Sequence, residues 1–369
     1  MNVQKYLDEM KNFQITLLKY LDHDNDQQSY LNLVTFVKDQ MNRKCPEEIK
    51  ETFQLIVNIA NNYHRQPGFF DKIDQLLLNI KDEIKQTFSN FDIFTIFKSN
   101  KRILLFLLKE TILEIDQQIF DVINDNDYWS ESYVKYFYFE CKPFIPTKLL
   151  EELESDLSKI DRQTFEENRK IGENDQFICQ LIRNDSIDDF ITFVNQTNLP
   201  FSSKIKRSIY ETNEYLLQKG SVDLIEYAAF FGSIQIFNYL LINKAYLRGS
   251  VWLDAIHGKN PEIIHSIQDN KIKPHDNNYK ECLEEAVKCY SSEIVNFFLD
   301  NLVDENQLDF YFENRNYEFI PQNIQQPLFL FYTCAYNHVF FVDLLLKNKE
   351  IKVNEKIIQK KNFFNEIQN

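Results

Sequence analysis

The chain has 369 residues and a net charge of −15, from 41 Lys and Arg against 56 Asp and Glu. Because nucleic acids and anionic membranes attract cationic surfaces, this balance argues against both as default partners. Hydrophobic residues make up 44% of the chain, with 33 Phe but 6 Gly and 9 Pro, which excludes an all-β fold with many tight turns and predicts an all-α fold with a large core.

The N-terminal sequence and the cysteines bear on location. The opening MNVQKYLDEM lacks the apolar core of a secretory signal, and the longest clean apolar run, residues 103–108, is too short to span a bilayer. The six cysteines are scattered without the spacing of a disulfide framework. We therefore expect an intracellular, cytoplasmic protein that does not insert into membranes.

Residues 1–175 carry helix signals throughout. Pro46 and the two glutamates after it are typical of a first helical turn, and apolar residues then recur at helical spacing. We expect six to eight helices here, forming an α-helical N-terminal region that caps the repeats. The three clearest apolar stripes run through residues 49–63, 73–88 and 147–160.

Two segments of this region suggest chemistry but are better explained by structure. Asp22, Asp24 and Asp26 have the spacing of the first ligands of a calcium loop, but the glycine and the final glutamate of such a loop are replaced by Gln27 and Leu33. The aromatic stretch YWSESYVKYFYF, residues 128–139, contains one basic residue, so we expect its rings to pack between the capping helices and the first repeat rather than stack on bases.

Repetition is the most informative feature of the second half. The segment LIEYAAFFGSIQIFNYLL, residues 224–241, places two alanines before a turn at Gly232 and an apolar stripe after it. This order predicts two short antiparallel helices whose exposed apolar face needs a neighbouring unit to cover it. Five units share the order, and the aligned positions before their turns are Leu181, Ala228, Ala255, Ala286 and Thr333.

The spacing of the units predicts a repeat array with insertions. Successive aligned positions are 47, 27, 31 and 47 residues apart, against an ankyrin period of about 33. The two long gaps leave room for inserted loops at residues 196–221 and 300–327. We place about five degenerate ankyrin-like repeats in residues 176–369.

Several strings resemble a large family of divergent ankyrin-repeat proteins of parasitic protists. They are FDIFTIFKSNKRILLFLL (91–108), RKIGENDQFICQLIRND (169–185), SIYETNEYLL (208–217), LIEYAAFFGSIQIFNYL (224–240) and WLDAIHGKNPEIIH (252–265). The resemblance implies a helical N-terminal region that continues into a degenerate ankyrin-repeat solenoid, and it brings no known catalytic residues. The chain departs from regular ankyrin repeats because the TPLH opening is absent and Gly232 is the one turn glycine among the five units.

These features predict a non-enzymatic scaffold that binds partner proteins through the concave face of the array. Loop tips at residues 243–250 and 271–280 would form that face. Aromatic residues and arginine contribute most energy at interfaces, so Tyr246, Arg248 and Trp252 are the strongest candidates. The full set of expected partner-binding residues is Tyr246, Arg248, Trp252, His257, Lys273, His275, Asp276 and Tyr279.

No catalytic, cofactor-binding or metal-binding residues are predicted. Phosphate-binding glycine motifs are absent from the sequence. Cys282 and Cys289 could be combined with His275 or His265 into a zinc site, but without closely paired ligands they fit core packing better. His257 has two readings, a hydrogen bond across repeats, which we favour, or a position facing a ligand.

Two other classes of function stay open. An enzyme could have its site in the N-terminal region, where Tyr63, His64 and Arg65 form the one local cluster. A self-associating structural protein could stack through an apolar end after Leu346, and the oligomeric state is left open, with a monomer as one possibility. The C-terminal lysines are expected to form a solvated helix end rather than a binding tail; they are Lys347, Lys349, Lys352, Lys356, Lys360 and Lys361.

Overall fold

The structure, a computed structural model, describes residues 2–24, 26–125, 130–157, 160–303, 308–321 and 326–347. These residues form 24 α-helices and two short β-strands, which confirms the all-α fold class. The chain divides into two compact units, Met1–Ile56 with Asn306–Asn369, and Val57–Glu305. The boundary at residue 175 between the N-terminal capping region and the repeats stays a prediction. The Lys349–Lys361 part of the C-terminal lysine cluster lies outside the described residues.

The first unit joins the beginning of the chain to its C-terminal part. Tyr6 packs edge-on against Phe340, with ring centroids 4.6 Å apart. Asp26, from the predicted acidic loop, caps a helix by accepting hydrogen bonds from the backbone N–H and hydroxyl of Ser29. The helices of this unit are α1 (Val3–Asp22), α2 (Gln27–Asn42), the first part of α3 (Pro46–Asn62), α22 (Leu308–Glu313), α23 (Gln326–Ala335) and α24 (Val339–Lys347).

A buried polar network around Glu51 holds the first unit together. The Glu51 carboxylate accepts a hydrogen bond of 2.7 Å from the Tyr317 hydroxyl and lies 3.2 Å from Nε of Arg315. It also contacts Nδ1 of His338, whose Nε2 lies 2.7 Å from the carbonyl oxygen of Phe312. Both His338 nitrogens therefore face acceptors. The carboxylate is thereby enclosed by Arg315, Tyr317 and His338 in the core.

The second unit begins with the end of α3 and a series of short helices. In the described residues the 1–175 region holds twelve helices, so the prediction of six to eight is wrong. The stripe at residues 73–88, for example, is two helices because Ile80 leaves the helical conformation between them. The helices here are α4 (Phe69–Asn79), α5 (Lys81–Thr87), α6 (Asn90–Phe97), α7 (Lys101–Lys109), α8 (Gln117–Asn124), α9 (Ser130–Tyr136), α10 (Tyr138–Cys141), α11 (Thr147–Leu157) and α12 (Arg162–Ile171).

The described part of the aromatic stretch packs inside this helical region. Tyr136 and Phe137 are buried, and the Tyr136 hydroxyl donates to the carbonyl oxygen of Arg169 in α12 at 2.8 Å. Lys101 of α7 lies over the Tyr136 ring, 5.1 Å from its centroid. The rings are therefore core residues between α7 and α12. Tyr128 and Trp129 lie outside the described residues.

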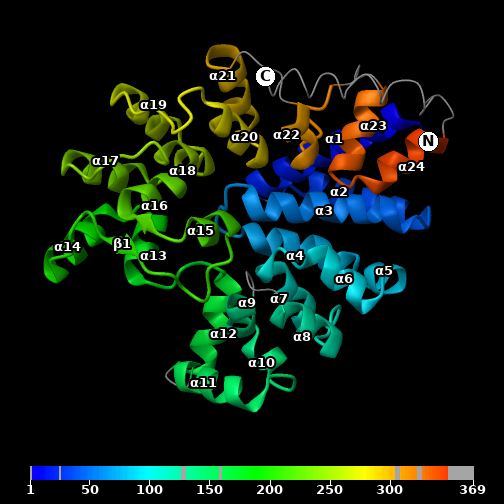
Figure 1. The fold of residues 1–369 in the computed structure, drawn as a ribbon, viewed down its shortest axis with the longest axis horizontal. Helices are drawn as coiled ribbons and strands as arrows, with labels where there is room; N and C mark the ends of the chain where they lie inside the picture. Colours follow the sequence, from blue (N-terminus) through cyan, green and yellow to red (C-terminus); the bar gives the residue numbers. More distant parts are fainter. Residues whose placement is uncertain are drawn as a thin grey trace, which may run out of the picture. The chain divides into compact units, whose positions relative to one another are not determined.

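Each of the five predicted repeats is a helical hairpin. Four lie in the second unit, and Figure 1 shows them in chain order from green to ochre. Within this unit the first helices of successive hairpins contact one another, as do the second helices of the first three. The four hairpins are α13 (Phe177–Arg183) with α14 (Ile187–Thr197), α16 (Leu224–Phe230) with α17 (Ile234–Ile242), α18 (Val251–Gly258) with α19 (Pro261–Asp269), and α20 (Lys280–Lys288) with α21 (Ser292–Asn301). The fifth hairpin, α23 with α24, belongs to the first unit.

The turn between the two helices has the same backbone conformation in all five hairpins. One residue in each has a positive φ, between 48° and 70°: Asp185, Gly232, Lys259, Tyr290 and Asn337. Each lies four positions after its aligned residue in the sequence, so the predicted register of the units is confirmed. A left-handed residue at this point lets backbone N–H groups reach the last carbonyls of the first helix.

Neighbouring turns in the second unit are tied by direct contacts. The Asp185 carboxylate accepts hydrogen bonds of 3.0 Å from the backbone N–H groups of Gln235 and Ile236 at the start of α17. The Asn260 side chain donates to the carbonyl oxygen of Gly232 at 2.9 Å. Each of these turn side chains therefore bonds to a backbone group of the neighbouring hairpin, which fixes the spacing of the array.

The inserted segments contain regular structure. Residues 196–221 include strand β1 (Lys204–Ile205) and helix α15 (Glu214–Lys219), and β1 pairs antiparallel with β2 (Val222–Asp223). The second insertion, residues 300–327, contains α22 within its described part. The insertions therefore add elements without altering the hairpin turns.

Candidate functional site

Three connections between hairpins meet along one edge of the second unit. β1 pairs with β2, and Arg248 of the next connection lies 3.4 Å from the Asp223 carboxylate in β2. Gly249 packs so closely against the third connection that an added Cβ would lie 2.6 Å from the carbonyl oxygen of Lys273. We call residues 200–210, 243–250 and 271–280 together the loop surface.

Four of the predicted partner-binding residues are accessible on the loop surface. Tyr246 is 76% exposed, which is unusual for a large aromatic side chain. Arg248, Lys273 and His275 are also exposed. The structure thus brings these four onto one edge, although whether they bind a partner stays a prediction.

Trp252 and His257 are buried, which corrects their assignment to an accessible surface. Trp252 is fully buried in α18, and its indole N–H donates to the carbonyl oxygen of Ile272 at 2.8 Å. His257 is 2% exposed. Both belong to the first helix of the third hairpin, whose sides are covered by the hairpins before and after it. Neither side chain can contact a partner without opening the array.

Asp276 and Tyr279 hold the third connection in shape. The Asp276 carboxylate accepts hydrogen bonds from the backbone N–H groups of Tyr279 and Glu281, at 3.2 and 2.9 Å, at the start of α20. The Tyr279 ring packs edge-on against Trp252, with centroids 5.4 Å apart. These two predicted contacts therefore have structural partners within the chain.

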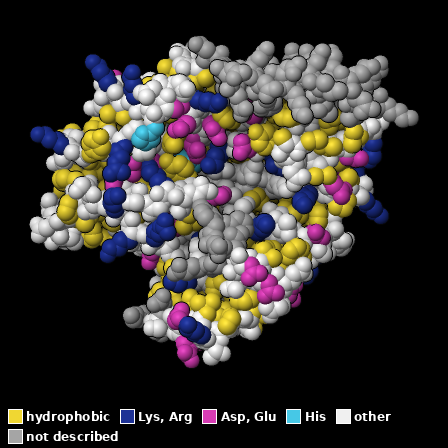
Figure 2. All heavy atoms as spheres, viewed as in Figure 1, with side chains coloured by type: hydrophobic (Ala, Val, Ile, Leu, Met, Phe, Trp, Pro, Cys, Tyr) yellow, Lys and Arg dark blue, Asp and Glu magenta, His cyan; other side chains and the backbone are white. Residues whose placement is uncertain are grey.

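The loop surface is basic in an acidic chain. It contains eight Lys and Arg residues and one Asp, whereas the whole chain has a net charge of −15. Figure 2 shows dark blue side chains gathered over the region of α17 and α19. The basic residues are Lys204, Lys206, Arg207, Lys244, Arg248, Lys271, Lys273 and Lys280, all exposed. This local excess favours an acidic ligand.

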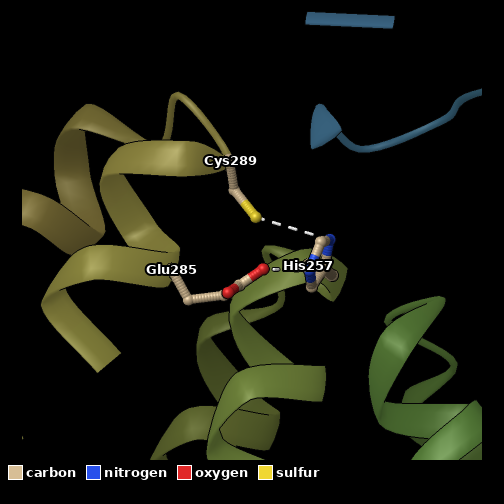
Figure 3. A group of neighbouring side chains, drawn as sticks. All are labelled: His257, Glu285 and Cys289. Atoms are coloured by element: carbon tan, nitrogen blue, oxygen red, sulfur yellow. Dashed lines mark hydrogen bonds and ion pairs between the residues drawn. The ribbon is translucent and has the colours of Figure 1, made fainter. Parts of the chain in front are cut away.

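A second candidate site is the buried cluster of His257, Glu285 and Cys289 (Figure 3). His257 Nε2 lies 2.7 Å from Oε1 of Glu285, and the Cys289 Sγ lies 3.4 Å from Nδ1. The imidazole packs against the rings of both Tyr215 and Phe230, with centroids 4.4 and 4.8 Å away. The hydrogen bond from α18 to α20 confirms the favoured reading of His257 as a link across repeats.

The environment fixes the protonation of this cluster. Burial lowers the pKa of His257 although Glu285 opposes the effect, so the ring is neutral. Burial alone would raise the pKa of Glu285, but its hydrogen bond with His257 and the charge of Lys288 outweigh burial and lower it. Burial raises the pKa of Cys289 well above its usual value. The contacts then fit a thiol S–H donating to Nδ1 and an Nε2–H donating to a carboxylate.

The order thiol, imidazole, carboxylate is that of a cysteine nucleophile with its base and orienting acid. However, Cys289 is 1% exposed and its thiol is held in the protonated form. A substrate could not reach it in this arrangement, so the geometry does not favour covalent catalysis. The pairing also differs from the zinc combination considered from the sequence, because His275 lies on the exposed third connection.

Sequence reasoning missed Glu285 and the groups around it. Lys219 lies 2.6 Å from the Asp254 carboxylate and 3.3 Å from Glu226, and the Tyr215 hydroxyl donates to Asp254 at 3.0 Å. A weak signal was available, because Glu285 and Cys289 are four residues apart and share a helical face. Lys219 and Tyr215 lie within an insertion, where the repeat pattern gives no register.

The three residues of the candidate enzyme cluster in the N-terminal region each contact their own partners. The Tyr63 hydroxyl accepts a hydrogen bond of 2.8 Å from Lys259. His64 Nδ1 lies 3.0 Å from the carbonyl oxygen of His257. Arg65 donates to Glu173 at 3.0 Å and to Thr212 at 3.1 Å. These contacts tie the residues after α3 to α18 and to Glu173 and Thr212, which gives each of the three side chains a structural role.

Glu211 lines a cavity of about 30 Å³ near the start of α15. Its Oε1 accepts a hydrogen bond of 2.7 Å from the backbone N–H of Asn213, whereas Oε2 has no hydrogen-bond partner among the described residues. Burial, followed by the charge of Glu173, raises the pKa of Glu211 to about 7. The volume suits roughly two water molecules rather than an organic ligand.

Replacing Glu211 with Gln is expected to stabilise the protein at alkaline pH. The folded-state pKa is raised above its ordinary value of 4.5, so the stability linked to protonation is present below pH 4.5 and is lost as pH rises through 7. The difference in unfolding free energy between the variant and the wild type should grow by about 2 kcal/mol in favour of the variant from pH 5 to pH 8, at about 1.4 kcal/mol per pKa unit. Urea unfolding at both pH values measures this. Glu262→Gln, at an exposed position, should show no such pH-dependent gain, and an equal gain in both variants would contradict the assignment.

Comparisons with known proteins leave the chain without a relative to guide the function: no family model, curated protein or solved structure matches it. Among the described residues, no helix has both the length and the apolar character needed to cross a membrane.

Proposed function

We propose that this chain is a non-enzymatic intracellular scaffold whose ankyrin-like hairpin array binds an acidic segment of a partner protein through the loop surface. The observation that carries the proposal is the continuity of three basic connections around an exposed tyrosine. Aromatic and arginine side chains dominate binding energy at interfaces, and Tyr246 and Arg248 lie two positions apart here.

The framework behind this surface suits binding without large rearrangement. The turns of successive hairpins are joined by hydrogen bonds, such as those that the Asp185 carboxylate accepts and the Asn260 amide donates. Trp252 is anchored to the third connection at Ile272, and Asp276 fixes the start of α20. Because the connections are held at their bases, less conformational entropy is lost when a partner orders them.

The chemistry favours an acidic peptide over a nucleic acid. The loop surface has eight basic residues in three short connections, within a chain whose net charge is −15. A phosphate backbone is bound best by an extended cationic track with several stacking rings. The loop surface instead offers one strongly exposed aromatic ring, Tyr246, with Asp276 and Glu281 close to its basic residues. A short acidic segment matches this mixture.

A charge-reversal experiment tests the proposal. A fluorescein-labelled polyglutamate peptide is titrated by anisotropy with the wild type and with the triple variant Lys244→Glu, Arg248→Glu and Lys273→Glu. We expect the variant to bind at least about tenfold more weakly, because it removes and inverts the attracting charges. The matched control, Lys85→Glu with Lys148→Glu and Lys170→Glu, changes the net charge equally at other positions of the same unit.

The control decides how the result is interpreted. Affinity retained by the control and lost by the loop variant supports the proposal, whereas equal weakening in both would assign the binding to net charge alone. A labelled single-stranded oligonucleotide is titrated in the same way. If it bound through the loop residues more tightly than the peptide does, the partner would be a nucleic acid and the proposal of a protein partner would be wrong. Affinity capture with the same three proteins then separates partners that need the loop surface from those that do not.

A further inference from the structure

We propose that Cys289 and His257 bind a thiophilic divalent metal ion, of which Zn²⁺ is the best match, with Glu285 orienting the imidazole, so that the ion clamps the third hairpin to the fourth. The site is independent of the loop surface, and nothing in the proposed scaffold function requires it.

The separation of the two ligand atoms suits a tetrahedral ion. The Cys289 Sγ lies 3.4 Å from Nδ1 of His257. Zinc–sulfur bonds of about 2.3 Å and zinc–nitrogen bonds of about 2.0 Å place two tetrahedral ligands roughly 3.5 Å apart. The backbone already holds these two atoms at the distance that the ion requires. Figure 3 shows the thiol, from the residue that follows α20, and the imidazole, from α18, pointing toward each other.

Glu285 provides the partner that metal-bound histidines usually have. Its carboxylate lies 2.7 Å from Nε2, on the opposite side of the ring from the thiol. A carboxylate at this place holds the imidazole in the tautomer that leaves Nδ1 free for the metal. Cys289, His257 and Glu285 offer ligand atoms that all lie within 4.8 Å of one another.

The proton and charge balance of binding is simple. The thiol proton leaves Sγ for solvent, the thiolate and Nδ1 bind the ion, and Nε2–H continues to donate to Glu285. The thiolate and the Glu285 carboxylate together offset the two positive charges of the ion. Lys288 keeps its place 3.5 Å from Glu285, where its side chain is 28% exposed. The thiol and the imidazole are buried, so an ion and its waters reach this point only when the α18–α20 contact opens.

The ligand types select the class of metal. A thiolate with an imidazole favours zinc, cobalt and copper over magnesium or calcium, which prefer oxygen ligands. Two direct protein ligands with water predict weaker binding than a closed four-ligand structural site. We therefore expect reversible binding that adds stability to the α18–α20 contact rather than an ion on which folding depends.

Cobalt(II) substitution tests the site directly. The protein is prepared with Cys45→Ser and Cys334→Ser, which remove the two thiols that are not buried, and is titrated with Co²⁺ alone. A sulfur-to-cobalt charge-transfer band should appear in the near ultraviolet and saturate at one ion per chain. Adding Cys289→Ala should abolish the band. Cys282→Ala, which removes a buried thiol within α20, should keep it.

The role of each residue gives further readouts. Glu285→Gln should retain the band but weaken affinity by about 10- to 100-fold, the usual effect of removing an orienting partner. Zn²⁺ should raise the melting temperature of the parent and of Cys282→Ala but not of Cys289→Ala, and circular dichroism confirms that each variant is folded. The proposal is overturned if the folded parent shows no sulfur band, or if the band persists in Cys289→Ala.

Discussion

Replacing Glu51 with alanine is expected to destabilise the first unit by about 3 to 5 kcal/mol. The Glu51 carboxylate is the common partner of Arg315, Tyr317 and His338. Removing one member of a buried ionic group leaves the opposite charge uncompensated in the core, which is far less favourable than losing a surface pair. Urea unfolding followed by circular dichroism measures the change.

Two further variants separate the network from general effects of mutation. Glu47→Ala, at an exposed position of the same helix, should change stability by no more than about 0.5 kcal/mol. Adding Arg315→Met to Glu51→Ala should give a smaller loss than the sum of the single losses, because the stranded cation is then gone. Additive losses would show that the charges do not act together.

The same carboxylate predicts how stability depends on acid. Burial alone would raise the pKa of Glu51, but the charges of His338 and Arg315 outweigh burial and hold it at about 2. The folded pKa lies below the ordinary value of 4.5, so Glu51 contributes stability above pH 4.5 that is lost as pH falls toward 2. Over this range the wild type should lose more stability than Glu51→Ala, and parallel curves would contradict the assignment.

The sequence pattern was sufficient for the hairpins and their register. Each turn follows its aligned position by four residues, although the residue at the turn ranges from Gly232 to Tyr290. The shared backbone geometry comes from hydrogen bonds between main-chain atoms, which any residue in the left-handed region can satisfy. Helical periodicity therefore located the units even where glycine was absent.

The contacts between distant segments could not be predicted in the same way. Glu51 and His338 are 287 positions apart, and no periodic pattern relates them. Trp252 was assigned to an accessible surface because it follows a loop, but α18 begins at Val251 and turns the indole into the core. Periodicity gives the face of a helix, whereas the burial of a residue at the helix start depends on what the neighbouring hairpin covers.

Gly258→Ala is expected to destabilise the second unit by about 3 kcal/mol, which is the upper end of the usual free-energy cost of adding a methyl group to a packed core. Alanine usually stabilises a helix by 0.5 to about 1 kcal/mol relative to glycine, so helix propensity predicts the opposite sign. The space decides the outcome: an added Cβ would lie 2.1 Å from the carbonyl oxygen of Ala229 and 2.8 Å from the backbone nitrogen of Gly232. Backbone atoms cannot rotate away as a side chain can. The hairpins α16–α17 and α18–α19 would therefore have to separate.

The readout for this variant is the fluorescence of Trp252, which lies in the same helix as Gly258, in a Trp129→Phe background. Gly68→Ala provides the control, because its Cβ would meet nothing within 4 Å while its φ of 78° makes alanine strained. That strain should cost about 1 to 2 kcal/mol. If Gly258→Ala were as stable as wild type, the two hairpins could not be packed as closely as described. The helix-to-helix approach that sets the spacing of the array would then need revision.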